Sequence, residues 1–286
     1  MQTHRVEGEV AERLRERLVP DSHPPDSLPV DPLPDPGSVL DVVDAVTRDV
    51  RGGSGAVVIE FAAEEATDDE ITSVGWNFLT CFCAPVPQYR SGELIYPVEV
   101  TDDAPGESHY SRSSDSGNLH TDGTFLPRPP DVAALLCLSA AGKGGETVLV
   151  DGHELVPELR SRNAGAVEIL SREHPFDCLG QLPGYETRRQ PIVSQTEGGY
   201  VLRYLRRYIE QGYAKEGEAI PAELAEAMDE LDALTADEAR QDPVRLERGQ
   251  MLVFDNHRFL HGRHAFSEDE GQRRRLRRIY GSYRER

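Results

Sequence analysis

Two periodicities alternate along the chain, and together they predict a mixture of helices and short strands. Apolar residues three or four positions apart are typical of amphipathic helices. The third such stretch opens with Thr67 and Glu70 at the spacing of a capping box, and the fourth begins at Pro221. The apolar face of the fourth comprises Leu224, Met228, Leu231 and Leu234. The predicted helices span residues 8–18, 39–50, 67–82 and the stretch from Pro221.

Short apolar or alternating runs predict strands over much of the remaining chain. Strand side chains alternate between two faces, so such runs are typical of half-buried or buried strands. Many short strands with helices at the front and in one insertion favour an α+β fold, mainly β, with a double-stranded β-helix (jelly-roll) core and helical cladding. The predicted strands span 55–61, 93–100, 119–125, 131–139, 146–150, 191–194, 199–204, 250–254 and 273–280.

The pattern predicts one main domain preceded by an arm. Residues 1–37 combine the first helix with a stretch from Pro20 to Pro36 that carries seven prolines, typical of an extended polyproline-like segment. We expect this arm to pack on the main domain, residues 38–286, which contains a helical insertion near 221–240. The polar, Gly- and Ser-rich stretch 101–118 is expected to be a mobile loop.

Charge and cysteine content restrict the partners and the compartment. The 51 acidic and 31 basic residues give a net charge of -20, which disfavours binding to nucleic acid or to anionic membranes. No apolar run is long enough to span a bilayer. The four cysteines form no CxxC pair and the first residues lack the apolar core of a signal peptide, so we expect a cytoplasmic protein.

A candidate metal site begins at LHTDG, residues 119–123. If this segment is a strand, His120 and Asp122 project from the same face and can bind one ion. An HxD pair taken alone is a weak signal, because it also occurs by chance.

The third candidate ligand comes from FDNHRFLHGRHAF, residues 254–266. Of its histidines, His261 follows the apolar pair Phe259–Leu260 and precedes Gly262, where a strand can end and the backbone can approach a metal closely. His257 and His264 are expected at the surface or behind the ligands. Two histidines and one carboxylate form the facial triad that suits iron(II) and leaves three coordination positions open.

An arginine-rich strand, RRRLRRIY at 273–280, is the next candidate element. Arg274, Leu276 and Arg278 share one face by period-2 alternation, and Arg273, Arg275 and Arg277 share the other. If the first face points into the barrel, its arginines need an anionic partner, which a dicarboxylate ligand would supply.

These motifs, with GGETVLVDG at 144–152, occur in the order seen in the taurine dioxygenase (TauD/TfdA) family of iron(II)/2-oxoglutarate enzymes, and the chain resembles that clavaminate synthase-like family over about residues 119–280. The resemblance implies that His120, Asp122 and His261 bind iron. It also implies that Thr147 and Arg278 hold the far carboxylate of 2-oxoglutarate, with Arg274 nearer its 1-carboxylate or the substrate. Four residues of strand span about 13 Å, so one carboxylate cannot easily engage both arginines.

The run YVLRYLRRYIEQGY at 200–213 resembles a segment that contributes to the substrate pocket in related enzymes. Arg203, Tyr204 and Arg207 are therefore candidates for binding a substrate carboxylate. Surface arginines of an amphipathic segment explain the run almost as well.

The resulting hypothesis is an Fe(II)/2-oxoglutarate-dependent oxygenase that uses O2 to hydroxylate an unactivated C–H bond. The expected substrate is a small carboxylate-bearing molecule, such as an amino acid or a natural-product intermediate. Desaturation or cyclisation by the same chemistry is one alternative. A zinc-dependent hydrolase is another, but it leaves Thr147 and the inward arginines unexplained. The last is a non-catalytic barrel that binds small molecules or a partner, and the intact ligand set argues against it.

Overall fold

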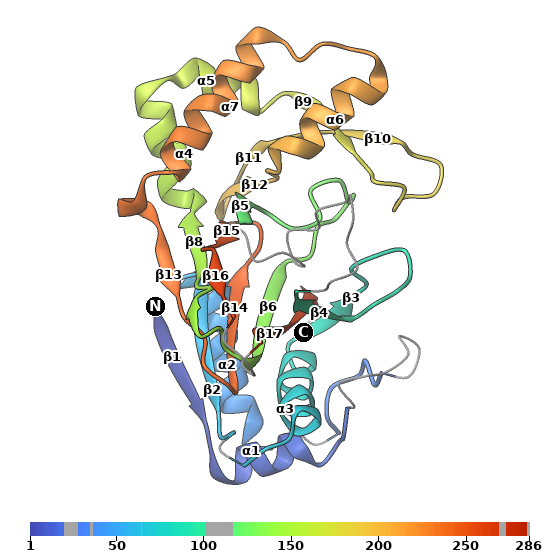
Figure 1. Ribbon diagram of the computed structural model, residues 1–286, viewed down its shortest axis with the longest axis vertical. Coiled ribbons are helices and arrows are strands. Elements are labelled where there is room, and N and C mark those ends of the chain that lie inside the picture. The colour runs from blue at the N-terminus through green and yellow to red at the C-terminus, as the bar shows by residue number, and fades with distance from the viewer. Residues whose placement is uncertain (20–27, 35–36, 64, 101–116, 269–272, 285–286) are drawn as a thin grey trace.

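The computed structural model describes residues 1–19, 28–34, 37–63, 65–100, 117–268 and 273–284. Within them, helices and strands alternate along the chain, and most strands belong to two main sheets (Figure 1). No helix in these ranges is long and apolar enough to cross a membrane. The helices are α1 (Gly8–Arg15), α2 (Val39–Gly52), α3 (Asp68–Thr80), α4 (Gly152–Arg162), α5 (Ala164–Leu170), α6 (Arg206–Glu216), α7 (Ala222–Thr235) and a 3-10 helix at Glu238–Arg240.

The strands of the described ranges form a larger and a smaller sheet with three added pairs. The seven-stranded sheet has the order β1 (Gln2–Val6), β2 (Ala56–Phe61), β14 (Gln250–Asp255), β6 (Val132–Ser139), β17 (Arg275–Tyr283) and β3 (Cys83–Val86), with β4 (Ile95–Glu99) also on β17. The four-stranded sheet has the order β13 (Asp242–Val244), β8 (Thr147–Asp151), β15 (Phe259–Arg263) and β5 (Gly117–His120). The pairs are β9 (Glu173–Asp177) with β10 (Thr187–Pro191), β11 (Val193–Thr196) with β12 (Gly199–Leu202), and β7 (Lys143–Gly144) with β16 (Phe266–Ser267).

Strict alternation along the strands explains how the layers pack. In β6, Ala134 and Leu136 belong to the core shared with α1–α3, while Ala133 and Leu135 belong to a core shared with the smaller sheet. In β15 of the smaller sheet, Leu260 turns to the helices α4–α7. Both sheets therefore bury both faces, which accounts for strands that are apolar at nearly every position.

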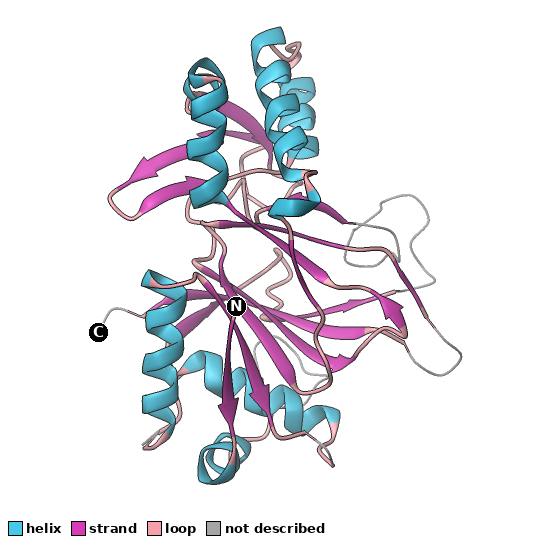
Figure 2. Cartoon of the chain, turned by 90° about the vertical axis from the view of Figure 1, so that its left-hand side faces the viewer, coloured by secondary structure: helices cyan, strands magenta, loops and turns pink. Residues whose placement is uncertain are grey.

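Two groups of helices lie at opposite ends of the molecule, with the sheets between them (Figures 1 and 2). Helices α1–α3 cover the outer face of the larger sheet, and α4–α7 cover the outer face of the smaller one. The space between the sheets is left for the third core and for a cavity, whose lining residues come from both sheets and from α6.

The mixed α+β prediction is confirmed, and several elements agree closely with their expected ranges. Thr67 caps α3 in a complete capping box with Glu70. The expected apolar face of α7 is buried, although Pro221 is its N-cap rather than its first helical residue. Helices α4, α5 and α6 and strands β1, β9 and β10 were not predicted, because their apolar positions are interrupted by charged residues. The expected helical insertion therefore extends well before residue 221.

The predicted strand 119–125 is wrong beyond its first residues. Strand β5 ends at His120, and the chain then turns, with Gly123 at φ 66° and the Leu126 amide bonded to the Gly123 carbonyl at 2.9 Å. The amide of Thr121 donates to the Tyr204 carbonyl instead of to a strand partner (2.9 Å). Asp122 thus lies in a turn rather than on a strand face.

Residues 28–34 of the proline-rich stretch are described and lie against the main core. Leu28 and Leu33 are buried in the same cluster as α2 and α3. The Trp76 indole donates to the Pro29 carbonyl (2.9 Å), and Arg17 donates to the Asp31 carbonyl (2.8 Å). The rest of the stretch, and residues 101–116 of the expected mobile loop, lie outside the described ranges.

Candidate active site

Strand pairing brings the two candidate histidine ligands together. His261 on β15 is directly opposite His120 on β5, and their rings lie 4.4 Å apart between centroids. The β15 alternation sends Phe259 and His261 to the side between the sheets, away from the helices that Leu260 contacts. His120 Nδ1 lies 2.7 Å from the Asn118 carbonyl, so it carries the proton and leaves Nε2 free to bind a metal.

Asp122 reaches the same point from the turn after β5, and a buried asparagine fixes that turn. The Asp122 amide donates to Asn256 Oδ1 (2.8 Å), while Asn256 Nδ2 donates to the carbonyls of Asp122 (3.1 Å) and Pro130 (3.0 Å). Asn256 is 1% exposed. Its side chain therefore holds the backbone that presents the carboxylate, without touching the carboxylate itself.

The three side chains form a compact, buried group. Asp122 Oδ2 is 3.3 Å from His261 Nε2, and Asp122 Oδ1 is 3.7 Å from His120 Nε2. One ligand atom from each residue lies within 4.8 Å of the others, and this is the group of described residues that could hold a metal.

Burial and neighbouring charges set the protonation of this group. Burial, with His261 close by, lowers the pKa of His120 to about 4. Burial acts to raise the pKa of Asp122, but Arg278 and His261 outweigh it and hold the pKa below its ordinary value. Neutral imidazole and ionised carboxylate are the forms that bind a metal.

Unsatisfied atoms test whether a metal fits here. Asp122 Oδ2 and His261 Nδ1 are buried and have no hydrogen-bond partner within the described structure. Buried polar atoms are normally paired, so the unpaired Asp122 Oδ2, which faces His261 Nε2, indicates that the site is completed by a ligand; His261 Nδ1 lies on the other side of its ring. Two imidazoles and a carboxylate are donors that suit Fe(II), so the residues fit the metal.

Arg278 lies next to this group. Its Nη1 is 3.5 Å from Asp122 Oδ1, its Nε donates to Gln88 Oε1 (2.7 Å), and its Nη2 donates to the Tyr89 hydroxyl (3.2 Å). Burial acts to lower the pKa of Arg278, and Tyr280 and Asp122 more than offset this, so the pKa is raised. The guanidinium is thus buried but well partnered.

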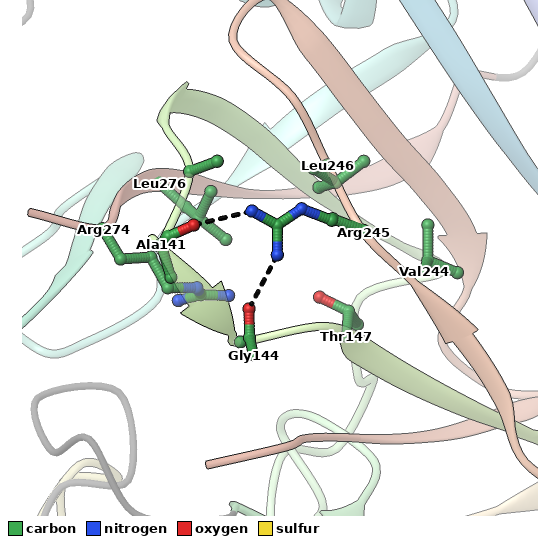
Figure 3. Close-up of a pocket in the computed structure, with 10 residues that line it drawn as sticks. Ala141, Gly144, Thr147, Val244, Arg245, Leu246, Arg274 and Leu276 are labelled. Carbon is green, nitrogen blue, oxygen red and sulfur yellow. Dashed lines mark hydrogen bonds between the residues drawn. The ribbon is translucent and has the colours of Figure 1, made fainter. Parts of the chain in front are cut away.

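Thr147 and Arg274 both line a second, small pocket (Figure 3). Arg245, also in this pocket, donates to the carbonyls of Ala141 (2.7 Å) and Gly144 (3.4 Å). Gly144 is needed for the close approach of this segment to β16, because a Cβ there would lie 2.3 Å from the Ala265 carbonyl oxygen.

Arg274 differs from Arg278 in its charged surroundings. It is 5% exposed, and among the described residues no carboxylate lies at ion-pair distance from its guanidinium. Burial, together with Arg263, lowers the pKa of Arg274 to about 10. A buried cation without an anion is costly, so this position is suited to an anionic ligand.

A cavity of about 540 Å³ connects these two points. Its lining includes the three candidate metal ligands, Thr147, Arg274 and Arg278, as the inward strand face predicted. Arg275 instead pairs with Asp68 on the outer side (2.6 Å), Arg273 is exposed, and Arg277 is buried 3.9 Å from Glu99. The volume is enough for a small ligand of the size that enzyme pockets bind.

The three candidate substrate residues separate in the structure. Arg207 lines the cavity, but Arg203 and Tyr204 do not. Arg203 donates to the Leu126 carbonyl (2.8 Å), and the buried Tyr204 donates to Asp232 Oδ1 (2.5 Å). His257 and His264 lie outside the metal group, as expected: His257 Nε2 is 3.4 Å from the Pro129 carbonyl, and His264 Nδ1 is 3.4 Å from Glu146 Oε2.

Several residues around the cavity were not found from the sequence. Asn256 lies inside the histidine-rich motif and could have been noticed there. Gln211 and Tyr280 likewise lie inside the runs 200–213 and 273–280, whereas no signal marked Gln88, Tyr89 and Asp177.

The fold and this buried His–Asp–His group define a mononuclear non-haem iron protein. The family model "Taurine catabolism dioxygenase TauD, TfdA family" matches residues 22–280, and the chain belongs to this family. It is an Fe(II)/2-oxoglutarate-dependent dioxygenase, with Fe(II) as cofactor and 2-oxoglutarate as co-substrate.

Curated proteins and solved structures of this kind are similar to the chain. It is 31% identical to a uridine-5'-phosphate dioxygenase from Amycolatopsis sp over 66% of this chain and 70% of that protein. It is 28% identical to mouse mitochondrial trimethyllysine dioxygenase over 52% of this chain and 37% of that protein. Asparagine oxygenase (AsnO) has a similar fold, with TM-score 0.73 and 18% identity over 97% and 92% of the two chains. The non-heme iron oxygenase OrfP has TM-score 0.68 and 17% identity over 98% and 94%.

Proposed function

We propose that this enzyme hydroxylates an unactivated C–H bond of a small, carboxylate-bearing molecule, such as an amino acid or a natural-product intermediate. The observation that carries the proposal is one cavity with a buried His–Asp–His group at one point and an uncompensated buried arginine beside Thr147 at another. Desaturation or cyclisation by the same chemistry is the alternative outcome.

His120, Asp122 and His261 would hold the iron. When bound, Fe(II) with 2-oxoglutarate and O2 supplies the oxidising equivalents for attack on a C–H bond. The protein's own contribution is to keep the His120 imidazole neutral and Asp122 ionised, and to fix these two ligands through Asn118 and Asn256. These contacts orient the ligands before any metal arrives.

Arg274 and Thr147 would hold the far carboxylate of 2-oxoglutarate. Their shared pocket and the absence of a described counter-ion at Arg274 support this pair over the pairing of Thr147 with Arg278. Arg278 has Asp122, Gln88 and Tyr89 as partners, so its proposed role is to stabilise the ionised Asp122 and to line the cavity. Four extended residues span about 13 Å, which supports different roles for the two arginines.

Arg207 would bind the substrate carboxylate. It lines the cavity at the first turn of α6, it is exposed, and it forms no ion pair with the described residues. The relatives that support a carboxylate-bearing substrate are a protein named for trimethyllysine and structures that contain 3-hydroxyasparagine and hydroxylated arginine, whereas the relative named for uridine-5'-phosphate points to a phosphate instead.

We further propose that the larger and smaller sheets are the two halves of a jelly-roll core, with residues 1–37 as an arm packed on it. Support comes from the apolar cluster that the two sheets share and from the burial of Leu14, Val19 and Leu33. All four cysteines are free thiols, which supports a reducing, cytoplasmic location.

Anaerobic addition of Fe(II) and 2-oxoglutarate tests the cofactor assignment. A weak visible charge-transfer band should appear in the wild type and be absent in His261→Ala, while His264→Ala, altered at an exposed histidine of the same motif, should retain it. A panel of free amino acids is then tested for substrate-dependent succinate formation. Turnover supported by Zn(II) without O2 would contradict the proposal and favour a hydrolase.

A further inference from the structure

Another wall of the cavity is built by one stripe of α6. Arg207, Gln211 and Lys215 all line the cavity at four-residue steps, so they follow one face of the helix over about 12 Å. Helix α6 lies directly on β9 (Figure 1). Gly212 allows this contact, because a Cβ there would fall 2.2 Å from the Pro175 carbonyl oxygen. This close packing fixes the position of the α6 stripe relative to β9.

Gln211 presents an unsatisfied acceptor on this wall. Its Oε1 is buried and has no hydrogen-bond partner within the described structure. Leaving a buried acceptor unpaired costs the desolvation of that group, and such atoms are rare in native proteins. Since the residue lines the cavity, a ligand in the cavity can supply the missing donor.

Asp177, the last residue of β9, presents a second acceptor nearby. It is 4% exposed and lines the same cavity. Its Oδ1 accepts hydrogen bonds from Lys215 Nζ (2.6 Å) and from the Leu179 amide (2.7 Å). Its Oδ2 has no hydrogen-bond partner among the described residues. Lys215 thus fixes the carboxylate to α6 while one oxygen stays available.

The turn after Asp177 has an unusual backbone. Leu179 has φ 51°, in the left-handed region that a leucine rarely adopts, and its amide is the one held by Asp177. Gln181 then accepts a hydrogen bond from the Arg90 amide (2.7 Å), which links this turn to the loop that carries Tyr89. Leu179, Gln181 and Tyr89 all line the cavity, so Asp177 also shapes its wall.

We propose that Asp177 and Gln211 determine substrate specificity by binding a substrate nitrogen that carries at least two N–H donors. Primary ammonium, guanidinium and carboxamide groups belong to this class, and trimethylammonium does not. Gln211 Oε1 is a buried acceptor without a partner and Asp177 Oδ2 has no described partner, so a nitrogen with two N–H donors can satisfy both, whereas a hydroxyl group supplies only one donor. This inference rests on the proposed function only in taking the cavity as the substrate site.

Binding is measured by titrating ligands into the anaerobic Fe(II)/2-oxoglutarate enzyme and following the visible band. The probes are L-lysine, L-ornithine, L-arginine, L-asparagine, L-glutamine and uridine 5'-monophosphate. For each amino acid that binds, the titration is repeated with analogues in which the α-nitrogen or the side-chain nitrogen is trimethylated or replaced by carbon. We expect one of the two positions to be essential, with a loss of about tenfold or more in affinity.

Variants assign the effect to the two residues. Gln211→Leu and Asp177→Asn should each lower the affinity for ligands with the essential nitrogen by about tenfold. Gln211→Glu keeps an acceptor and adds no donor, so it should bind a cationic nitrogen at least as tightly as the wild type does. The matched control is Glu210→Gln, at the neighbouring exposed position of α6, which does not line the cavity. It should bind like the wild type.

The outcomes separate this inference from the proposed function. A wild type without the band contradicts the cofactor assignment. If the band appears but none of the five amino acids perturbs it, the nitrogen subsite alone is overturned, whether or not uridine 5'-monophosphate perturbs the band. The nitrogen subsite is also overturned if the wild type, Gln211→Leu and Asp177→Asn bind every ligand with equal affinity. It is overturned, too, if Gln211→Glu loses as much affinity as Gln211→Leu.

Discussion

Arg278 lies on β17 and Arg274 lies directly before this strand; both line one cavity, yet their surroundings differ. Arg278 has Asp122, Gln88 and Tyr89 as partners, and its pKa is raised. Arg274 has Arg263 and Glu146 as charged neighbours but no ion pair to a described carboxylate, and burial with Arg263 lowers its pKa to about 10. The same residue type is therefore charge-compensated at the metal end and uncompensated at the Thr147 end.

This difference indicates which arginine awaits a ligand. A buried cation that already faces a carboxylate gains little from a second anion, whereas one that faces another cation gains a great deal. The cavity thus has a preformed end, where protein groups satisfy one another, and an incomplete end, where a ligand carboxylate would replace the missing protein anion. The following experiments are designed to separate the two ends.

The largest effect is expected from breaking the metal end. His261→Ala should abolish iron retention and turnover, because two remaining ligands cannot hold Fe(II) firmly, while the fold is kept since the ring lines a cavity. Iron content after gel filtration and the thermal midpoint check both parts. His264→Ala, at a side chain 48% exposed, is the control. Normal iron content in His261→Ala would refute the ligand assignment.

The next effect is expected at the incomplete end. Arg274→Ala should raise the 2-oxoglutarate requirement strongly, because losing one partner of a desolvated charge pair costs roughly 2–5 kcal/mol. The measurement is the apparent KM for 2-oxoglutarate at saturating Fe(II). Arg273→Ala, altered at the exposed neighbour, should change it little. An equal or larger increase in Arg278→Ala would contradict the distinction between the two arginines.

A smaller effect should follow from the hydroxyl beside Arg274. Thr147→Val keeps the shape and removes one hydrogen bond, so we expect a loss of about 1 kcal/mol in 2-oxoglutarate binding, or about fivefold in the dissociation constant. Titration of the anaerobic iron enzyme measures it. The double variant with Arg274→Ala should show less than the sum of the two losses, since both groups would bind one carboxylate. Full additivity would place them on separate groups.

The smallest effect concerns a residue that the sequence suggested for substrate binding and that lies outside the cavity. Tyr204→Phe should lower the free energy of unfolding by about 1 kcal/mol, because the bond to Asp232 is lost, and leave the KM for substrate and co-substrate unchanged. Urea denaturation and steady-state kinetics check this. Tyr185→Phe, at a ring 57% exposed, is the control. A raised KM for the substrate in Tyr204→Phe would indicate that Tyr204 does contribute to substrate binding.

Much of the fold was predictable because burial on both faces marks a strand locally. The run over β6 and the run over β14 are apolar at nearly every position, and the capping box of α3 involves residues only three apart. Helices α4–α6 escaped prediction because charged residues interrupt their apolar stripe. Their packing against β8 and β9 decides their conformation, and that packing is not local.

The sequence by itself determined the ligand types and their order: an HxD pair, a later histidine, and an arginine-bearing strand whose inward face alternation identifies. Only the tertiary structure decided how they divide. It placed Asp122 in a turn held by Asn256, set Thr147 beside Arg274, and moved Tyr204 out of the cavity while keeping Arg207 in it. It also packed α6 against β9 at Gly212, so that Gln211 and Asp177 line the same cavity. The reason is physical: side-chain direction follows from local periodicity, whereas the neighbour that compensates a charge or an acceptor comes from another part of the chain.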